Sequence, residues 1–279
     1  MGVIIAFWSP LHGRGNTSAA IATAMQMAMK YNVMEYITHS HFARSTMESA
    51  FLTSDDDGDM LKFSDLGLDS LSRSVRTRCI TNDDVKSYCN KINDNLYFIS
   101  GSRKSHKELF DTNVGQDFID ICNFIKEGDN VTFIDVDSGY NNKVANEIIE
   151  VADYVVVTLD QTNIHCKEYF EELNMIPEEK EIIILGRYDY MSKYSKNYVS
   201  KKYKREVFTL PNDSDFLDAT NNHKVNKYFE SINKSNVENM LLDEVNLLVD
   251  NLADKIQAAG VSIEAKEEEH KKRFSLFKR

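Results

Sequence analysis

The residues with the clearest chemical potential lie in a short loop near the start of the chain. An apolar run, Val3 to Phe7, leads into a loop with two glycines, and an alanine-rich helical pattern follows the loop. Backbone N–H groups in such a loop, together with the N-terminus of a helix, bind phosphate oxygens. The segment therefore predicts a phosphate-binding site formed by Gly13, Arg14, Gly15, Asn16, Thr17 and Ser18.

The side chain that normally supplies charge to such a loop is missing. In a nucleotide-binding loop, a lysine neutralises the β- and γ-phosphates, and a Ser or Thr hydroxyl binds magnesium. Thr17 can supply the hydroxyl, but Asn16 stands where the lysine is expected. Arg14 offers a guanidinium that can bind phosphate oxygens in a bidentate manner. Two outcomes are open from these residues: nucleotide binding with weak or no turnover, and complete loss of binding.

Strands and helices that would position this loop alternate along most of the chain. The apolar runs are short, continuous and β-branched, which is typical of a parallel sheet covered on both faces. Strands are expected at 3–7, 33–37, 96–99, 131–135, 154–158, 182–185 and 207–210, and helices at 17–30, 83–92, 114–126, 142–150, 165–173 and 196–204. The predicted fold class is therefore α/β: a doubly wound, mostly parallel sheet of about seven strands with helices on both faces.

The last part of the chain has a different character. From about residue 236 to 258, apolar residues recur at helical spacing, which predicts either a helix packed on the domain or one that binds a partner or a second copy. We divide the chain into a domain over 1–235 and a helical extension over 236–279. Phe274, Leu276 and Phe277 lie among basic residues at the very end, so this tail either contacts an anionic membrane or acidic partner, or is a frayed basic end.

Charge and composition limit the classes of function. The net charge is −11, which argues against broad binding to a nucleic-acid backbone. No apolar run approaches the length that crosses a bilayer, so we expect a cytoplasmic protein that can lie peripherally at the inner face of the membrane. His39 and His41 alternate along an extended segment with no third ligand beside them, which favours loop-packed or solvated side chains over a zinc site.

Several segments together resemble a known family. PLHGRGNTS, at 10–18, is similar to the phosphate loop of the ParA/MinD family of P-loop ATPases, in which the pattern is KGGxGKT with a second signature lysine. NVTFIDVDSGYN, at 130–141, resembles the family's Walker B region, and EVADYVVVTLDQTN, at 150–163, resembles its next strand. Order and spacing agree over about residues 1–229. The resemblance implies a homodimer and a site for ATP or ADP with Mg²⁺, with Thr17 and Asp135 near the metal.

The departures from the family pattern bear on activity. Leu11 and Asn16 replace both lysines, and Thr38 to Ser40 hold no carboxylate where the family's catalytic aspartate is expected. The resemblance thus implies at most a weak ATPase, or a protein without nucleotide. The segment from 185 to 219 resembles the part of the family that contacts the base, which singles out Arg187, Asp189 and Pro211.

Within the family, the chain resembles the TadZ/CpaE branch most. We therefore expect a protein that positions a pilus, secretion or conjugation apparatus by binding proteins of that apparatus. One alternative is a partitioning ATPase that binds DNA without sequence preference. A second alternative is a nucleotide-free dimeric scaffold.

Overall fold

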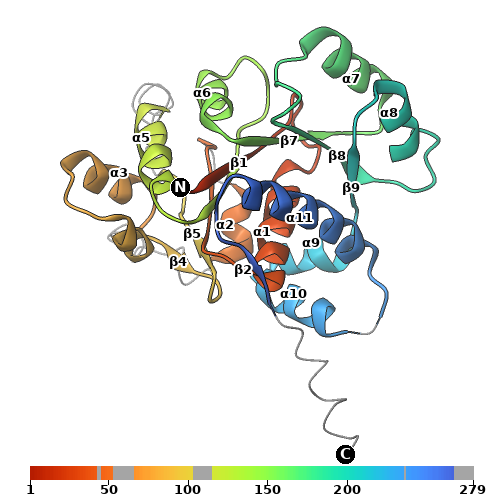
Figure 1. Cartoon of the computed structure of the whole chain (residues 1–279). Helices are drawn as coiled ribbons and strands as arrows, with labels where there is room; N and C mark the ends of the chain where they lie inside the picture. Colours follow the sequence, from red (N-terminus) through yellow and green to blue (C-terminus); the bar gives the residue numbers. More distant parts are fainter. Residues whose placement is uncertain (43–44, 53–65, 103–114, 236, 267–279) are drawn as a thin grey trace, which may run out of the picture.

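One mixed sheet forms the centre of the molecule (Figure 1). The computed structural model describes residues 1–42, 45–52, 66–102, 115–235 and 237–266. Eight strands lie in the order β4-β5-β3-β6-β1-β7-β8-β9, and all neighbours are parallel except β4 and β5. Their bounds are β1 Val3–Trp8, β3 Glu35–His39, β4 Asn90–Lys91, β5 Leu96–Phe98, β6 Val131–Asp135, β7 Tyr154–Leu159, β8 Glu181–Tyr188 and β9 Val207–Pro211. The α/β fold class and all seven expected strands are confirmed.

Helices cover both faces of the sheet, and each face has its own apolar core. Because side chains alternate along a strand, Ile5 and Phe7 enter one core whereas Ile4 and Trp8 enter the other. The first face carries α1 Asn16–Lys30, α2 Thr46–Phe51, α9 Ser214–Asn221, α10 Val225–Lys234 and α11 Met240–Ala258. The second carries α3 Leu68–Thr77, α5 Gly115–Lys126, α6 Lys143–Val151, α7 Asn163–Lys167 and α8 Lys196–Tyr203.

Three details of the expected elements need correction. The α-helix expected at 83–92 is a 3₁₀ helix, η2 (Asn82–Tyr88), followed by the short strand β4, because the backbone turns extended at Cys89. The helix expected at 165–173 begins as α7 and continues as a π-helix, η4 (Glu168–Leu173). The helices α2, α9 and α10 had no counterpart in the sequence-based expectation.

The C-terminal helix α11 packs against α1 with its apolar stripe. Leu241, Val245, Leu248 and Leu252 are all buried. Polar contacts flank the stripe: the Gln26 amide donates to Asn246, and Lys30 pairs with Asp250 at 2.5 Å. Within the part of the chain that the structure describes, this is the packed arrangement of the two that the sequence allowed. No described helix is both long and apolar enough to cross a membrane.

Asn239 begins α11 as its N-cap, and its loss is expected to weaken the helix. The Asn239 side chain accepts a hydrogen bond from the Leu242 N–H at 2.8 Å. We expect Asn239→Ala to lower the free energy of unfolding by about 1 kcal/mol in urea denaturation. Asn197→Ala, an exposed change inside α8, is the control and should cost less than about 0.5 kcal/mol. Equal losses in the two variants would contradict the capping role.

The last described residues, 264–266, lie beside the C-terminal end of α1 and the strand that follows it. β10 (Glu264–Ala265) pairs antiparallel with β2 (Tyr31–Asn32), and the Lys266 ammonium donates to the Ala28 carbonyl at 2.6 Å. Glu35 is fully buried at the start of β3, and neither carboxylate oxygen has a hydrogen-bond partner among the described residues. Burial raises the pKa of Glu35 well above its usual range, and the Lys266 charge opposes that rise only in part.

Candidate functional site

The glycine-containing loop lies at the carboxyl edge of the parallel strands, between β1 and α1. Gly13 and Gly15 have φ of 75° and 90°, a region that glycine adopts without the steric cost of a Cβ. The Ser9 hydroxyl donates to the Thr158 carbonyl at 2.7 Å and so fixes the start of the loop to β7. A side chain at Gly186 would collide with the Arg14 carbonyl oxygen, so β8 approaches the loop at a distance that only glycine permits.

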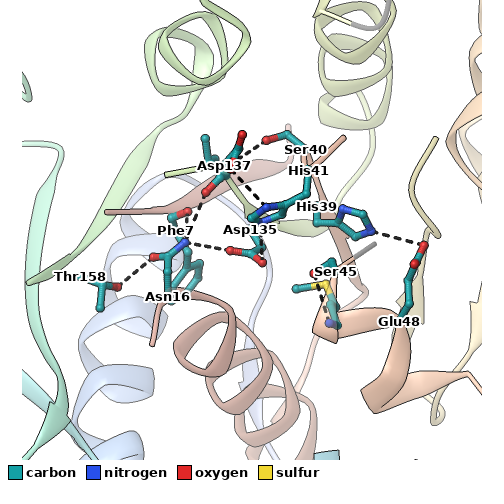
Figure 2. Close-up of polar contacts among 12 residues, drawn as sticks. Phe7, Asn16, His39, Ser40, His41, Ser45, Glu48, Asp135, Asp137 and Thr158 are labelled. Carbon is teal, nitrogen blue, oxygen red and sulfur yellow. Dashed lines mark hydrogen bonds and ion pairs between the residues drawn. The ribbon is translucent and has the colours of Figure 1, made fainter. Parts of the chain in front are cut away.

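The Asn16 side chain is buried and points toward Phe7, Asp135 and Thr158 (Figure 2). Its amide nitrogen donates at 2.8 Å both to the Phe7 carbonyl and to Asp135 Oδ1. Its amide oxygen accepts from the Thr158 hydroxyl at 2.9 Å. The residue at the lysine position is therefore used to join β1, β6 and β7, and it is not directed toward a phosphate above the loop.

His41 binds the other oxygen of Asp135. Its Nε2 lies 3.0 Å from Asp135 Oδ2, and its Nδ1 lies 3.4 Å from Asp137 Oδ1. Burial opposes the charged ring, but the hydrogen bonds to the two carboxylates outweigh burial and raise the pKa of His41 to about 10. Near neutral pH, His41 is thus an imidazolium held between two carboxylates. Asp135 is fully buried, and the protein itself occupies both of its oxygens.

The second histidine, His39, has a different surrounding. Its side chain is 2% exposed, and its Nε2 lies 3.5 Å from Glu48 Oε1 without hydrogen-bond geometry. The rings of His39 and His41 are 5.6 Å apart. Across the described ranges, no group of three His, Cys, Asp or Glu side chains has an arrangement that could hold a metal ion.

Arg14, inside the loop, is also paired with a carboxylate of this chain. Its guanidinium forms an ion pair with Asp160 at 2.7 Å, and Asp160 also contacts His165 Nδ1 at 2.9 Å. Although burial opposes it, hydrogen bonding to His165 and the Arg14 charge hold the pKa of Asp160 below its usual range. Two cations near the loop, Arg14 and His41, are therefore both neutralised by aspartates of this chain.

The remaining expected site residues spread along the same edge of the sheet. Thr17 and Ser18 form the first turn of α1, and Arg187 lies beside Gly15. Asp189 accepts a hydrogen bond from the Met191 N–H at 2.8 Å within the next loop, and Pro211 ends β9. Phe274, Leu276 and Phe277 lie outside the described residues. The structure thus brings the loop of residues 13–18 together with Asp135 through Asn16, whereas Asp189 lies in the loop after β8 and Pro211 is the last residue of β9.

A cleft of about 530 Å³ opens beside the loop. Its walls are residues 10–12 on one side and residues 137–144, after β6, on the other. Asp137 and Lys143 are the charged side chains in its lining, and His12 and Asn142 are further polar groups there. The cleft borders the start of the loop, and residues 13–18 are not among the residues that line it.

His41, Thr158 and Asp160 are site residues that the sequence did not single out as ligands of the loop. A partial signal was present, because each lies at or just after the carboxyl end of a strand. In parallel sheets, residues at these ends meet at one edge, where ligands bind. The contacts of these three residues depend on which strands are neighbours in the sheet. The order of the strands along the chain does not determine which strands are neighbours.

Comparison with known proteins identifies the fold. No family model and no curated protein sequence matches the chain. A ParA family ATPase from Chlorobium tepidum superposes with a TM-score of 0.70 at 13% identity, over 90% of this chain and 98% of that one. MinD from Pyrococcus horikoshii, complexed with Mg-ADP, gives 0.63 at 13% identity, over 94% and 98%. The chain has the ParA/MinD fold. A third ParA/MinD structure, pNOB8 ParA bound to nonspecific DNA, gives 0.57 at 15% identity, over 90% and 99%.

The resemblance to ParA/MinD proteins raises the question whether Mg²⁺ and a nucleotide fit these residues. The side chain at the lysine position bonds to protein groups, and both Asp135 oxygens have protein donors. Arg14, the nearby guanidinium, is paired with Asp160. This arrangement does not fit a nucleotide held through position 16 or a metal held through Asp135.

Proposed function

We propose that this chain is a ParA/MinD-like positioning protein that works without ATP turnover. The observation that carries the proposal is the inward hydrogen bonding of Asn16 to Phe7, Asp135 and Thr158. Phosphoryl transfer is accelerated mainly by positive charge directed at the transferring group. In this chain the position of that positive charge is occupied by Asn16, whose neutral amide is hydrogen-bonded to neighbouring strands.

Hydrogen bonds and ion pairs between the chain's own side chains hold the site together. A buried carboxylate needs a counter-charge or several hydrogen bonds, because desolvation of an unpaired charge is costly. Asp135 has both, from His41 and Asn16. The carboxyl edge of the sheet is therefore stabilised by the chain's own side chains. We infer that its shape does not depend on nucleotide.

The partners and cargo are also part of the proposal. We propose a homodimer, as the ParA/MinD resemblance implies, that binds proteins of a pilus, secretion or conjugation apparatus, because its atypical phosphate loop resembles that of the TadZ/CpaE branch. DNA partitioning is the second candidate. It is favoured by residues 187–205, which contain seven basic side chains and one acidic one, and by the fold shared with a DNA-bound ParA protein.

Phosphate release with Mg-ATP tests the proposal directly. We expect the purified chain to release no more phosphate than Thr17→Ala, because a contaminating ATPase would persist equally in both preparations. Saturable, Mg²⁺-dependent release that disappears in Thr17→Ala would contradict a turnover-free role. A fluorescent fusion in cells that normally make the protein then separates the two candidates: discrete foci support positioning of an apparatus, and coverage of the nucleoid supports partitioning.

A further inference from the structure

A basic and aromatic surface lies beside the candidate site, on the loop after β8 and on α8. Four of its side chains are large and exposed: Tyr190 at 45%, Met191 at 89%, Tyr194 at 38% and Tyr198 at 43%. Lysines surround them in the sequence, and Lys193, Lys201, Lys202 and Lys204 are all exposed. We name these eight residues the α8 surface.

The loop that presents Met191 is held in place by hydrogen bonds. The Gln161 side chain donates to the Asp189 and Tyr194 carbonyls at 3.1 and 3.0 Å and accepts from the Asp189 N–H at 2.7 Å. Asp189 in turn accepts from the Met191 N–H. Both ends of the loop are thus tied to the end of β7. Met191 is therefore an exposed side chain on a loop whose backbone is fixed by hydrogen bonds.

The helix behind this loop is anchored on its other side. Val199 is buried, and the Tyr203 ring stacks on Phe170 with centroids 4.3 Å apart. One face of α8 therefore packs on the domain, and the face with Tyr198 and Lys201 points to solvent. No ion pair joins Lys193, Lys201 or Lys204 to any described residue. Their charges are available to a partner.

The charge of this surface defines the partner as anionic. Residues 187–205 carry a strong positive excess in a chain whose net charge is −11. An anionic surface would attract this region and repel most of the rest, so the molecule would approach it in one orientation. Lysines close to anionic lipids each strengthen membrane attraction.

The exposed apolar groups favour a lipid surface over a nucleic acid. Duplex DNA offers phosphates and groove edges, so Met191 would gain nothing from it. The Tyr194 and Tyr198 rings meet edge to face at 87°, so they do not form parallel platforms for successive bases. Tyrosine is enriched at the membrane–water interface, where its ring and hydroxyl both find partners, and an apolar tip such as Met191 can enter the acyl boundary.

We propose that the α8 surface is a docking site for an anionic phospholipid membrane, with Met191 and Tyr194 inserted at the headgroup level and the lysines bound to lipid phosphates. This site is separate from the tail that holds Phe274 and Phe277. It does not depend on whether the phosphate loop binds nucleotide. It gives the chain a membrane contact built from its ordered domain.

Vesicle flotation of the full-length chain tests the docking site. The parent for this test carries Phe274→Ser, Leu276→Ser and Phe277→Ser, which silences the tail. It should float with phosphatidylcholine vesicles that contain phosphatidylglycerol. With vesicles of phosphatidylcholine alone, it should remain in the bottom fraction of the gradient. Adding Met191→Ser and Tyr194→Ser should lower the partition coefficient about tenfold. Adding Lys193→Gln and Lys201→Gln instead should lower it about fivefold for each lysine, at low salt.

A matched variant at the end of α10 and the start of α11 controls for general loss of charge and apolar surface. Met240→Ser with Lys234→Gln removes an exposed methionine and an exposed lysine from a different region, and flotation should not change. The proposal is overturned if the tail-silenced chain does not float with anionic vesicles, or if the α8 variants float as well as this control. Salt-sensitive binding of duplex DNA that requires the same lysines, without flotation, would assign the surface to nucleic acid instead. None of these outcomes depends on ATP turnover.

Discussion

Replacement of His41 by alanine is expected to lower the free energy of unfolding by about 3–5 kcal/mol, because it leaves a buried carboxylate without its counter-charge. Asp135 is fully buried and would keep only the hydrogen bond from Asn16. Urea denaturation near neutral pH measures the loss. His12→Ala removes an exposed histidine from the same edge of the sheet and should cost less than about 0.5 kcal/mol.

A double-mutant cycle shows whether the loss comes from the pair. Asp135→Asn removes the charge that His41 neutralises, so the second change, His41→Ala, should cost far less in that background. We expect a coupling free energy of about 2 kcal/mol or more between positions 41 and 135. If the effects of His41→Ala and Asp135→Asn simply add, the ion pair does not hold this edge of the sheet.

Replacement of Glu35 by glutamine is expected to stabilise the protein, by an amount that grows with pH. Burial raises the pKa of Glu35 in the folded state above the value of 4.5 that it has when solvated. The folded protein therefore keeps a proton that the unfolded chain releases, so stability falls as pH rises above the unfolded pKa. Glutamine has no such proton. Its advantage should be small near pH 4 and increase by about 1.4 kcal/mol per pH unit above that, until the folded pKa is passed.

Urea denaturation at a series of pH values measures this difference. Glu127→Gln, an exposed change on the same chain, is the control and should give a difference that does not vary with pH. A constant difference for Glu35→Gln would show that the carboxyl is already ionised in the folded protein, with Lys266 as its counter-charge.

The sequence predicted the scaffold of the site better than its contacts. The β-branched runs located all seven main strands, because short, continuous, β-branched runs are typical of strands buried on both faces of a parallel sheet. β4 has two residues and no apolar signal, and its sequence was assigned to a helix. The helices α2, α9 and α10 are at most ten residues long, so their periodicity is hard to distinguish from that of loops.

The roles of individual side chains depended on the order of strands. Asn16 was identified as a missing lysine, but its bonds to Phe7 and Thr158 require β1 to lie beside β7, which no local pattern gives. His41 meets Asp135 because β3 and β6 are neighbours, with His39 and Asp135 in register. The position of His41, two residues after the end of β3, does not by itself indicate a contact with Asp135.

The packing of α11 on α1 has a consequence for how the protein is made. α1 is synthesised well before the helix that covers it, at Met240–Ala258, and before the strand β10, at Glu264–Ala265. At about 5–20 residues per second, one core of the sheet therefore lacks α11 while residues 31–258 are synthesised. The nascent chain should bind chaperones that shield apolar surface until α11 has been synthesised and can pack on α1.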